Sequence, residues 1–196
     1  MFIKKWQEYG ISRDGTHAKL AYNWYGSWTT LYSLYADAIL CFHPSITSDR
    51  SFFSMHSDSD PSSPPIPITQ PQLSNQKPLI PRSSKPSDFI PHGIYANQSA
   101  YYAVVMQRYG LPLDSRHLYT KSDWEFQAAA VAEPAVRKLI LDRVSLWVNE
   151  TSTDRPLTDL YETEGSGGFP GFIFTARPVV GGHFAFLALE RACKGR

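Results

Sequence analysis

The chain has 196 residues, of which 42% are hydrophobic and 14% aromatic, so its composition allows a buried core in one domain or in a piece of a larger one. The formal net charge of +1 gives no electrostatic reason to expect nucleic acid or an anionic membrane as a partner. No run of about 18 apolar residues occurs, so no transmembrane helix is predicted.

Residues 1–8 are typical of the last turns of an amphipathic helix. They lack the charged start, apolar stretch and small-residue cleavage site of a secretory signal peptide. We therefore expect the chain to begin within a helix and to be a truncated piece of a longer protein.

A helix is predicted over residues 28–40, because apolar side chains recur there at spacings of three and four: Trp28, Leu31, Tyr32, Tyr35 and Ile39. The composition then changes to Ser and Pro, and nine of the fifteen prolines fall between Pro61 and Pro91. Such a stretch buries too little apolar surface to offset chain entropy, which predicts a disordered insertion.

Helical periodicity returns over residues 94–109, where Gly110 is expected to provide a left-handed cap. Ser122 and Glu125 have the spacing of a capping box at the start of the next helix, which runs to Val131. Pro134 opens another helix with a predicted buried stripe and a water-facing side. The stripe comprises Val136, Leu139, Ile140, Val144 and Trp147, and the water-facing residues are Arg137, Lys138, Asp142 and Arg143.

A loop is expected over residues 149–171, a short strand over residues 172–174, and a last helix from about Pro178. Sequential helices joined by short connections predict stacked α-hairpins in an all-α fold. The two cysteines, Cys41 and Cys193, are expected to be buried free thiols, with a single disulfide as the alternative. Two N-x-S/T triplets make Asn97 and Asn149 candidate glycosylation sites.

No nucleotide-binding glycine motif is present, and the six histidines share no metal-ligand spacing, so we predict neither a cofactor nor a metal site. Polar and aromatic residues instead gather on the predicted loops. Carboxylates there are suited to general acid or base chemistry, and we expect Asp123, Asp154 and Asp159 to be catalytic. Trp24, Arg155, Arg177 and His183 are the expected substrate-binding residues.

Each candidate also has a purely structural interpretation. Asp123 is well placed to favour a helix N-terminus, and Glu125 to complete the capping box. Asp154 is suited to an Asx-turn or an ion pair, and Arg177 to pairing with one of these acids. Asp159 fits a structural role equally well. Trp24 is suited to a core position, and His183 to a structural hydrogen bond.

Several ordered strings resemble the fungal glutaminase A family: Lys19–Trp28 with Leu31–Asp37, Tyr109–Arg116 with Tyr119–Phe126, Thr153–Pro156 with Thr158–Tyr161, and Ala176–Phe184. The resemblance implies an (α/α)6 six-hairpin toroid of which this chain holds only the C-terminal hairpins. It divides the chain into a helical segment (1–47), the disordered insertion (48–87) and the C-terminal hairpins (88–196).

The resemblance further implies an extracellular enzyme that hydrolyses L-glutamine to L-glutamate and ammonia, with glutamine as its small-molecule partner and with neither nucleic acid nor membrane as a partner. It carries over no catalytic residue. Two alternatives remain open, a glycoside-hydrolase-like enzyme with paired carboxylates and a non-catalytic scaffold. Because the earlier hairpins are missing, we expect this chain alone to be inactive.

Overall fold

The computed structural model describes residues 2–41, 90, 93–153, 155–171 and 174–192. Their elements, in chain order, are α1 (Phe2–Lys5), the π-helix η1 (Trp6–Gly10), α2 (Leu34–Ile39), α4 (Ile94–Val105), β1 (Tyr119–Lys121), α5 (Ser122–Val131), α6 (Pro134–Glu150), β2 (Leu160–Glu162), the 3-10 helix η3 (Pro178–Phe184) and α7 (Ala185–Ala192). The predicted insertion, 48–87, lies outside the described residues.

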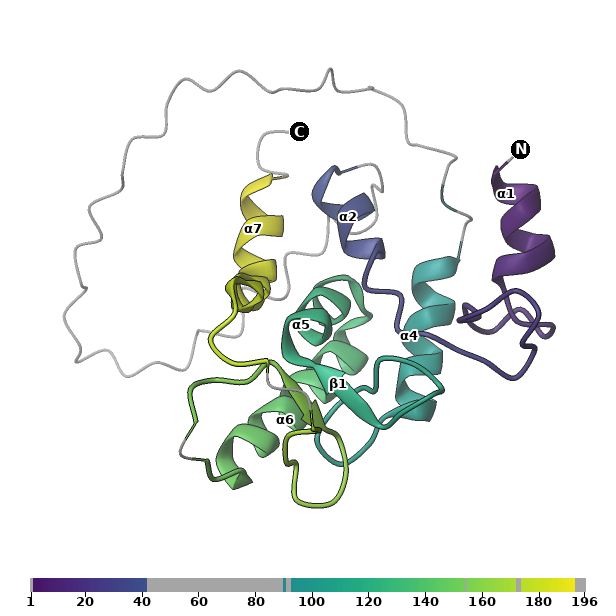
Figure 1. Ribbon diagram of the computed structural model, residues 1–196. Helices are drawn as coiled ribbons and strands as arrows, with labels where there is room; N and C mark the ends of the chain where they lie inside the picture. Colours follow the sequence, from purple (N-terminus) through teal and green to yellow (C-terminus); the bar gives the residue numbers. More distant parts are fainter. Residues whose placement is uncertain (1, 42–89, 91–92, 154, 172–173, 193–196) are drawn as a thin grey trace.

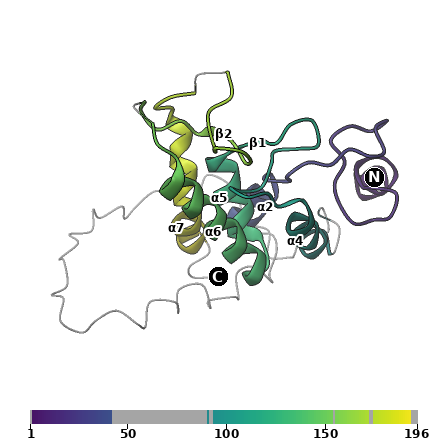
Figure 2. The same ribbon diagram turned by 90° about the horizontal axis from the view of Figure 1, so that it is seen from below.

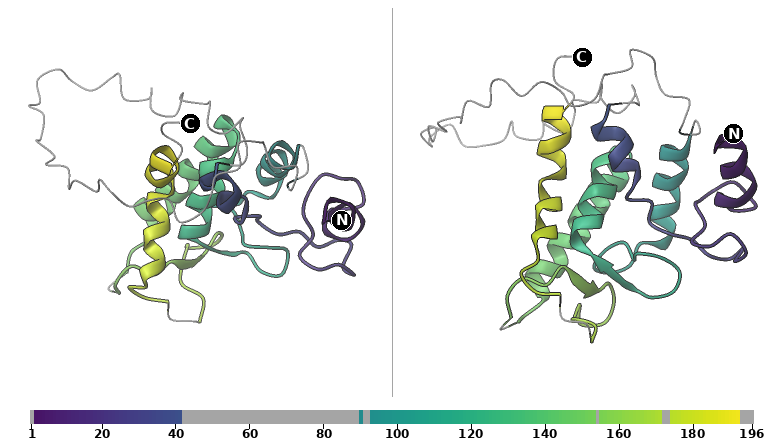
Figure 3. Two further views of the ribbon diagram at one scale, coloured as in Figure 1. Left: turned by 90° about the horizontal axis from the view of Figure 1, so that it is seen from above. Right: turned by 45° about the horizontal axis from the view of Figure 1, so that its top comes forward.

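The helices stand in a row, with α7 on one side, α5 and α2 in the middle, and α4 followed by α1 on the other side (Figures 1 and 3). Helix α6 follows α5 after a two-residue break and packs against both α5 and α4. The small β1–β2 sheet and the loops around it lie near the middle of this row, below α5 in Figure 1 and next to the start of that helix (Figure 2).

The main core lies where α5 and α6 meet. Ala128 and Ala129 are completely buried, so their small side chains let α5 approach its neighbours closely. Ile140 and Val144 of α6 pack into the same cluster, together with Tyr102 and Leu111. A second cluster joins α2 to α4 and α5 through Leu34, Ala38, Ile94, Tyr95 and Val131. The interior thus fixes the α5–α6 hairpin, and with it the direction of the first turn of α5.

Both helices of this hairpin agree with the sequence prediction. Helix α5 spans Ser122–Val131, and Pro134 occupies the first turn of α6. Ile140, Val144 and Trp147 are the buried residues of α6. Arg137 is partly buried, contrary to prediction, because its guanidinium donates to the carbonyl oxygens of Ala129 and Ala132, both at 3.2 Å.

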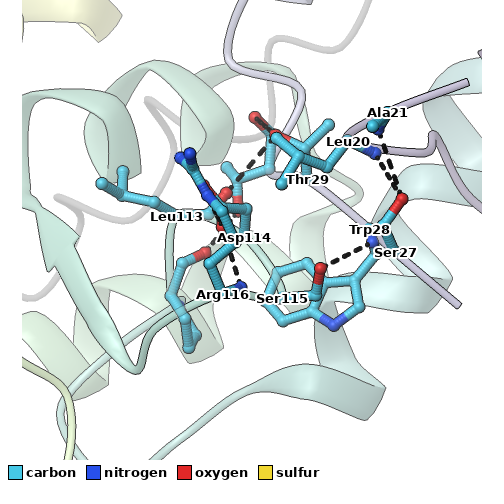
Figure 4. Close-up of polar contacts among 11 residues, drawn as sticks. Leu20, Ala21, Ser27, Trp28, Thr29, Leu113, Asp114, Ser115 and Arg116 are labelled. Carbon is cyan, nitrogen blue, oxygen red and sulfur yellow. Dashed lines mark hydrogen bonds and ion pairs between the residues drawn. The ribbon is translucent and has the colours of Figure 1, made fainter. Parts of the chain in front are cut away.

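The predicted helix over residues 28–40 is wrong in its first half, since α2 begins only at Leu34. Residues 28–30 instead bind the distant segment 112–115 (Figure 4). The Thr30 amide donates to the Leu113 carbonyl at 2.8 Å, and the Trp28 amide donates to the Ser115 hydroxyl at 3.3 Å. Amides committed to this long-range pairing are not available for helical hydrogen bonds.

Three further expectations need correction. Helix α4 ends at Val105, and Gly110, with φ +150°, caps no helix. The capping box does not form, since α5 has no side-chain cap and Glu125 is completely buried. The fold is not purely α, because Tyr119–Lys121 and Leu160–Glu162 pair as antiparallel strands with Thr120 opposite Tyr161.

The last helix begins where expected, at Pro178, although its first two turns are 3-10. Cys41 is disulfide-bonded, so the expectation of a free thiol there is wrong, and Cys193 lies outside the described residues. Residues 172–173 of the predicted short strand also lie outside them. Over the described part of the chain, no helix is both long and apolar enough to cross a membrane.

Candidate functional site

Polar side chains from three segments meet at the first turn of α5. The register of the sheet brings the first two of these segments together, because Lys121 pairs with Leu160 and the next amide, that of Ser122, donates to the Asp159 carbonyl at 2.9 Å. Asp123 and Asp159, which are far apart in the sequence, therefore become neighbours. We call the group of Lys121, Ser122, Asp123, Asp159, Arg177 and His183 the acid cluster.

Asp159 and Arg177 form a two-pronged ion pair. The Arg177 Nε donates to Asp159 Oδ1 at 2.9 Å, and a terminal guanidinium nitrogen donates to Oδ2 at 2.5 Å. Asp159 is 3% exposed, whereas the Arg177 side chain is 29% exposed. The guanidinium also lies 4.2 Å from the centre of the Phe174 ring, which fixes its plane. Both oxygens of Asp159 are thus committed to Arg177.

Asp123 differs from Asp159 in having an uncommitted oxygen. The residue is 5% exposed, and its Oδ1 is buried without a hydrogen-bond partner among the described residues. Burial raises the pKa of the Asp123 carboxyl, and the negative charge of Asp159 raises it further. A buried carboxyl group with a raised pKa and an uncommitted oxygen is suited to accept and release a proton.

Helix η3 covers Asp123 from one side. A Cβ added at Gly182 would lie 2.7 Å from the Asp123 Cβ, so only glycine permits this close approach. The next residue, His183, has its Nε2 2.8 Å from the Ser122 hydroxyl and lies against Phe126. Burial lowers the pKa of His183, which leaves its imidazole neutral at pH 7.

Aromatic rings flank the remaining cation of the cluster. The Lys121 ammonium lies 5.3 Å from the ring centres of both Trp124 and Phe174. Trp124 is itself stacked on Tyr32, with the ring centres 3.7 Å apart. Neither Lys121 nor Ser122 was singled out as a site residue from the sequence. Their position in the run of polar residues beside Asp123 was the available signal.

Glu125 lies one helical turn behind the cluster and has no free oxygen. Its Oε1 accepts the Leu111 amide at 2.7 Å, and its Oε2 lies 2.5 Å from the Tyr161 hydroxyl oxygen. Complete burial raises its pKa to about 8. A Cβ at Gly110 would lie 2.1 Å from Glu125 Oε1, which explains the glycine at that position. These contacts give Glu125 a structural role.

The structure does not bring the other expected site residues to the cluster. Asp154 lies outside the described residues. Arg155 is exposed and lines a separate cavity, and Trp24 is 46% exposed on the loop between Lys19 and Ser27. Asn97 is exposed on α4, where its side-chain amide donates to the Gly15 carbonyl at 3.1 Å, and Asn149 is exposed near the end of α6.

The comparisons with known proteins identify the family to which the chain belongs. Residues 1–58 and 85–187 match the Glutaminase A six helical-hairpin domain, and the chain belongs to this family. No solved structure matches the chain.

Two fungal relatives cover nearly the whole chain. A probable glutaminase of Arthroderma benhamiae is 58% identical over 195 residues, which are 100% of this chain and 20% of the relative. Glutaminase A of Aspergillus oryzae is 34% identical over 191 residues, which are 96% of this chain and 21% of the relative. The chain therefore spans about a fifth of the length of these relatives.

Proposed function

We propose that the chain is a segment of an extracellular glutaminase that hydrolyses L-glutamine to L-glutamate and ammonia. Its helices would be the C-terminal hairpins of an (α/α)6 toroid. The observation that carries the proposal is the free, buried oxygen of Asp123 beside the Asp159–Arg177 pair, in a chain 34% identical to a glutaminase A.

In this proposal Asp123 transfers the proton. As a carboxylate it accepts a proton from the attacking water, whose oxygen bonds to the carboxamide carbon. It then returns that proton to the amide nitrogen, the carbon–nitrogen bond breaks, and the products are glutamate and ammonia. The raised pKa of Asp123 supports this role, because a carboxylate that holds a proton more strongly than usual is a better base toward the attacking water.

The Asp159–Arg177 pair has a different part in the proposal. Because both Asp159 oxygens bind Arg177, the pair is held in a fixed position next to Asp123. The negative charge of Asp159 adds to burial in raising the pKa of Asp123, and the positive charge of Arg177 opposes it. The neutral His183 fixes Ser122 next to Asp123 through its 2.8 Å hydrogen bond. Arg177 and His183 would thus position the acid cluster.

We expect the chain to need the rest of the domain for activity. It covers about a fifth of the length of its relatives, and several large apolar side chains on its surface are exposed: Val104, Val148, Phe184 and Leu187. Such side chains at the faces of a partial ring are available to pack against further hairpins.

The test is a hybrid enzyme in which this chain replaces the matching segment of the Aspergillus oryzae glutaminase A. Ammonia release from L-glutamine and sugar release from aryl glycosides are measured side by side, and the isolated chain is assayed in parallel. The proposal expects ammonia from the hybrid alone. Glycoside hydrolysis without ammonia would point to the glycosidase alternative, and a folded hybrid with neither activity would point to a scaffold.

Secretion is tested separately. We expect the full-length protein to appear in the culture medium and to carry N-linked glycan on Asn149, which is exposed near the end of α6. Asn97 is the weaker of the two acceptors, since its amide already donates to Gly15 and the hydroxyl of Ser99, in the same triplet, accepts the amide of Glu133 at 3.0 Å. A mobility shift after deglycosylation, lost in Asn149→Gln, is the expected result.

A further inference from the structure

A cavity of about 640 Å³ lies apart from the acid cluster, between the end of α6, residues 151–153 and 155, and the turn at residues 166–169. None of the residues that line it belongs to the cluster. Its volume lies within the range of small-molecule sites in proteins, about 300–1,000 Å³. The chemistry of its walls therefore decides what it would bind.

The wall formed by the turn is held rigidly against α6. The Trp147 indole donates to the Gly167 carbonyl at 2.8 Å, and the Glu162 amide donates to the Gly168 carbonyl at 2.8 Å. Gly167 has φ +67°, and a Cβ there would lie 2.7 Å from Trp147 Cδ1 and 2.9 Å from the Thr151 hydroxyl oxygen. Phe169 then lies edge-on to Trp147, with 6.5 Å between ring centres. The cavity is thus preformed.

The two charged residues in the walls have different partners. Glu150 binds the Arg108 guanidinium at 2.9 Å and the Tyr109 hydroxyl at 2.6 Å, so its charge is compensated. Arg155 is exposed, and among the described residues its guanidinium has neither an ion pair nor a hydrogen bond. Among the described residues that line the cavity, the uncompensated charge is therefore positive.

Hydroxyl groups complete the lining. Thr151, Ser152, Thr153 and Ser166 all border the cavity. The Thr153 oxygen accepts the Arg155 amide at 3.1 Å, so its own hydrogen is free to donate. The Thr151 hydroxyl, in contrast, is buried next to Gly167 and is not available to a ligand. Several hydroxyl donors around one free guanidinium match the acceptor pattern of a carboxylate.

We propose that this cavity binds a small carboxylate-bearing molecule, with the Arg155 guanidinium as its main recognition group and the hydroxyls of Thr153 and Ser166 as further donors. Phe169 supplies an apolar surface for the carbon chain of the ligand. The site is distinct from the acid cluster, and binding there does not require hydrolysis.

The test is calorimetric titration of the purified 196-residue chain with glutarate, L-glutamate and, as a neutral polar control, glucose. We expect the two carboxylates to bind. Arg155→Ala should lower their affinity by about 10- to 100-fold, the range for a lost hydrogen bond to a charged group. Arg155→Lys gives a smaller loss, since it keeps the charge without the planar fork. Arg191→Ala, which removes an exposed arginine on α7, leaves affinity unchanged.

The result is separable from the glutaminase proposal, because Asp123→Asn leaves carboxylate binding intact if the two sites are distinct. Loss of binding in Asp123→Asn but not in Arg155→Ala would place the carboxylate site at the acid cluster and overturn the inference. Absence of carboxylate binding by a folded chain, or glucose binding of equal strength, would overturn it as well.

Discussion

The hydroxyl of Tyr161 lies between two acceptors, Glu125 Oε2 at 2.5 Å and the Tyr109 carbonyl oxygen at 2.9 Å. A tyrosine hydroxyl has one hydrogen and serves one acceptor fully. A protonated Glu125 removes the conflict, because the carboxyl then donates to Tyr161 while Tyr161 donates to Tyr109. The raised pKa of Glu125, about 8, agrees with this arrangement.

A pH dependence of stability follows. The pKa of Glu125 is about 8 in the folded chain and close to 4.5 in the unfolded chain. The stabilisation of the folded chain by protonated Glu125 is therefore fully present below pH 4.5 and is lost as the pH rises through 8. Between the two pKa values, the titration of Glu125 alone should lower the free energy of unfolding by about 1.4 kcal/mol per pH unit. Urea unfolding at pH 5, 6, 7 and 8 measures the slope. In Glu125→Gln, whose amide still donates to Tyr161, the slope should become shallower. An unchanged slope would mean that Glu125 is ionised in the folded chain.

Removing the hydroxyl of Tyr161 tests the same pair from the other side. Tyr161→Phe keeps the stacking on Trp147, with ring centres 3.8 Å apart, but leaves the buried Glu125 oxygen and the Tyr109 carbonyl without their partner. The expected loss of unfolding free energy is about 1–3 kcal/mol, measured by urea titration. A loss close to zero would indicate that water or another donor replaces the hydroxyl.

Gly110 and Gly165 form a matched pair of glycines. Both have positive φ, but a Cβ at Gly110 meets Glu125 at 2.1 Å, whereas nothing lies within 4 Å of a Cβ at Gly165. Gly165→Ala should cost only the backbone strain, about 1 kcal/mol, and Gly110→Ala at least about 2 kcal/mol more. Thermal or urea unfolding of the two variants compares them. Equal losses would contradict the close approach of Glu125 to residue 110.

Arg177 is expected to stabilise the chain through Asp159. Arg177→Ala leaves the buried Asp159 carboxylate unpaired, which should lower the unfolding free energy by roughly 2–4 kcal/mol. Lys138→Ala, which breaks the exposed pair with Asp142 on α6, is the control and should cost less than about 0.5 kcal/mol. Similar losses in both variants would argue against burial of Asp159.

The sequence predicted the parts of the fold that depend on local patterns. Helix α6 followed from apolar periodicity and from Pro134, and its bounds agree with the structure. The bounds of α5 also agree, although the capping box that predicted its start does not form. The pairing of Thr30 with Leu113 depends on residues more than eighty positions apart, so the apolar spacing from Trp28 onward predicted a helix that the long-range bonds prevent. Three-residue strands such as β1 give too short a signal to recognise.

The candidate site was predictable in its residue types but not in its arrangement. Asp123, Asp159, Arg177 and His183 were all identified from the sequence, and the structure places them together. Glu125 fitted a local capping motif, but its burial under Gly110 and Tyr161 is a tertiary effect that the motif does not encode. Arg155 was grouped with the same site from its residue type, whereas the structure places it at a separate cavity.

The proton-transfer role of Asp123 is tested most directly in the hybrid glutaminase that carries this chain. Asp123→Asn keeps the shape of the side chain but cannot accept the proton of the attacking water, and Asp142→Asn, on the exposed face of α6, is the matched control. Loss of general acid and base catalysis should lower kcat for L-glutamine by about 100- to 10,000-fold in Asp123→Asn, with the Asp142→Asn enzyme unchanged. A folded Asp123→Asn hybrid that releases ammonia at the rate of the parent would contradict the account.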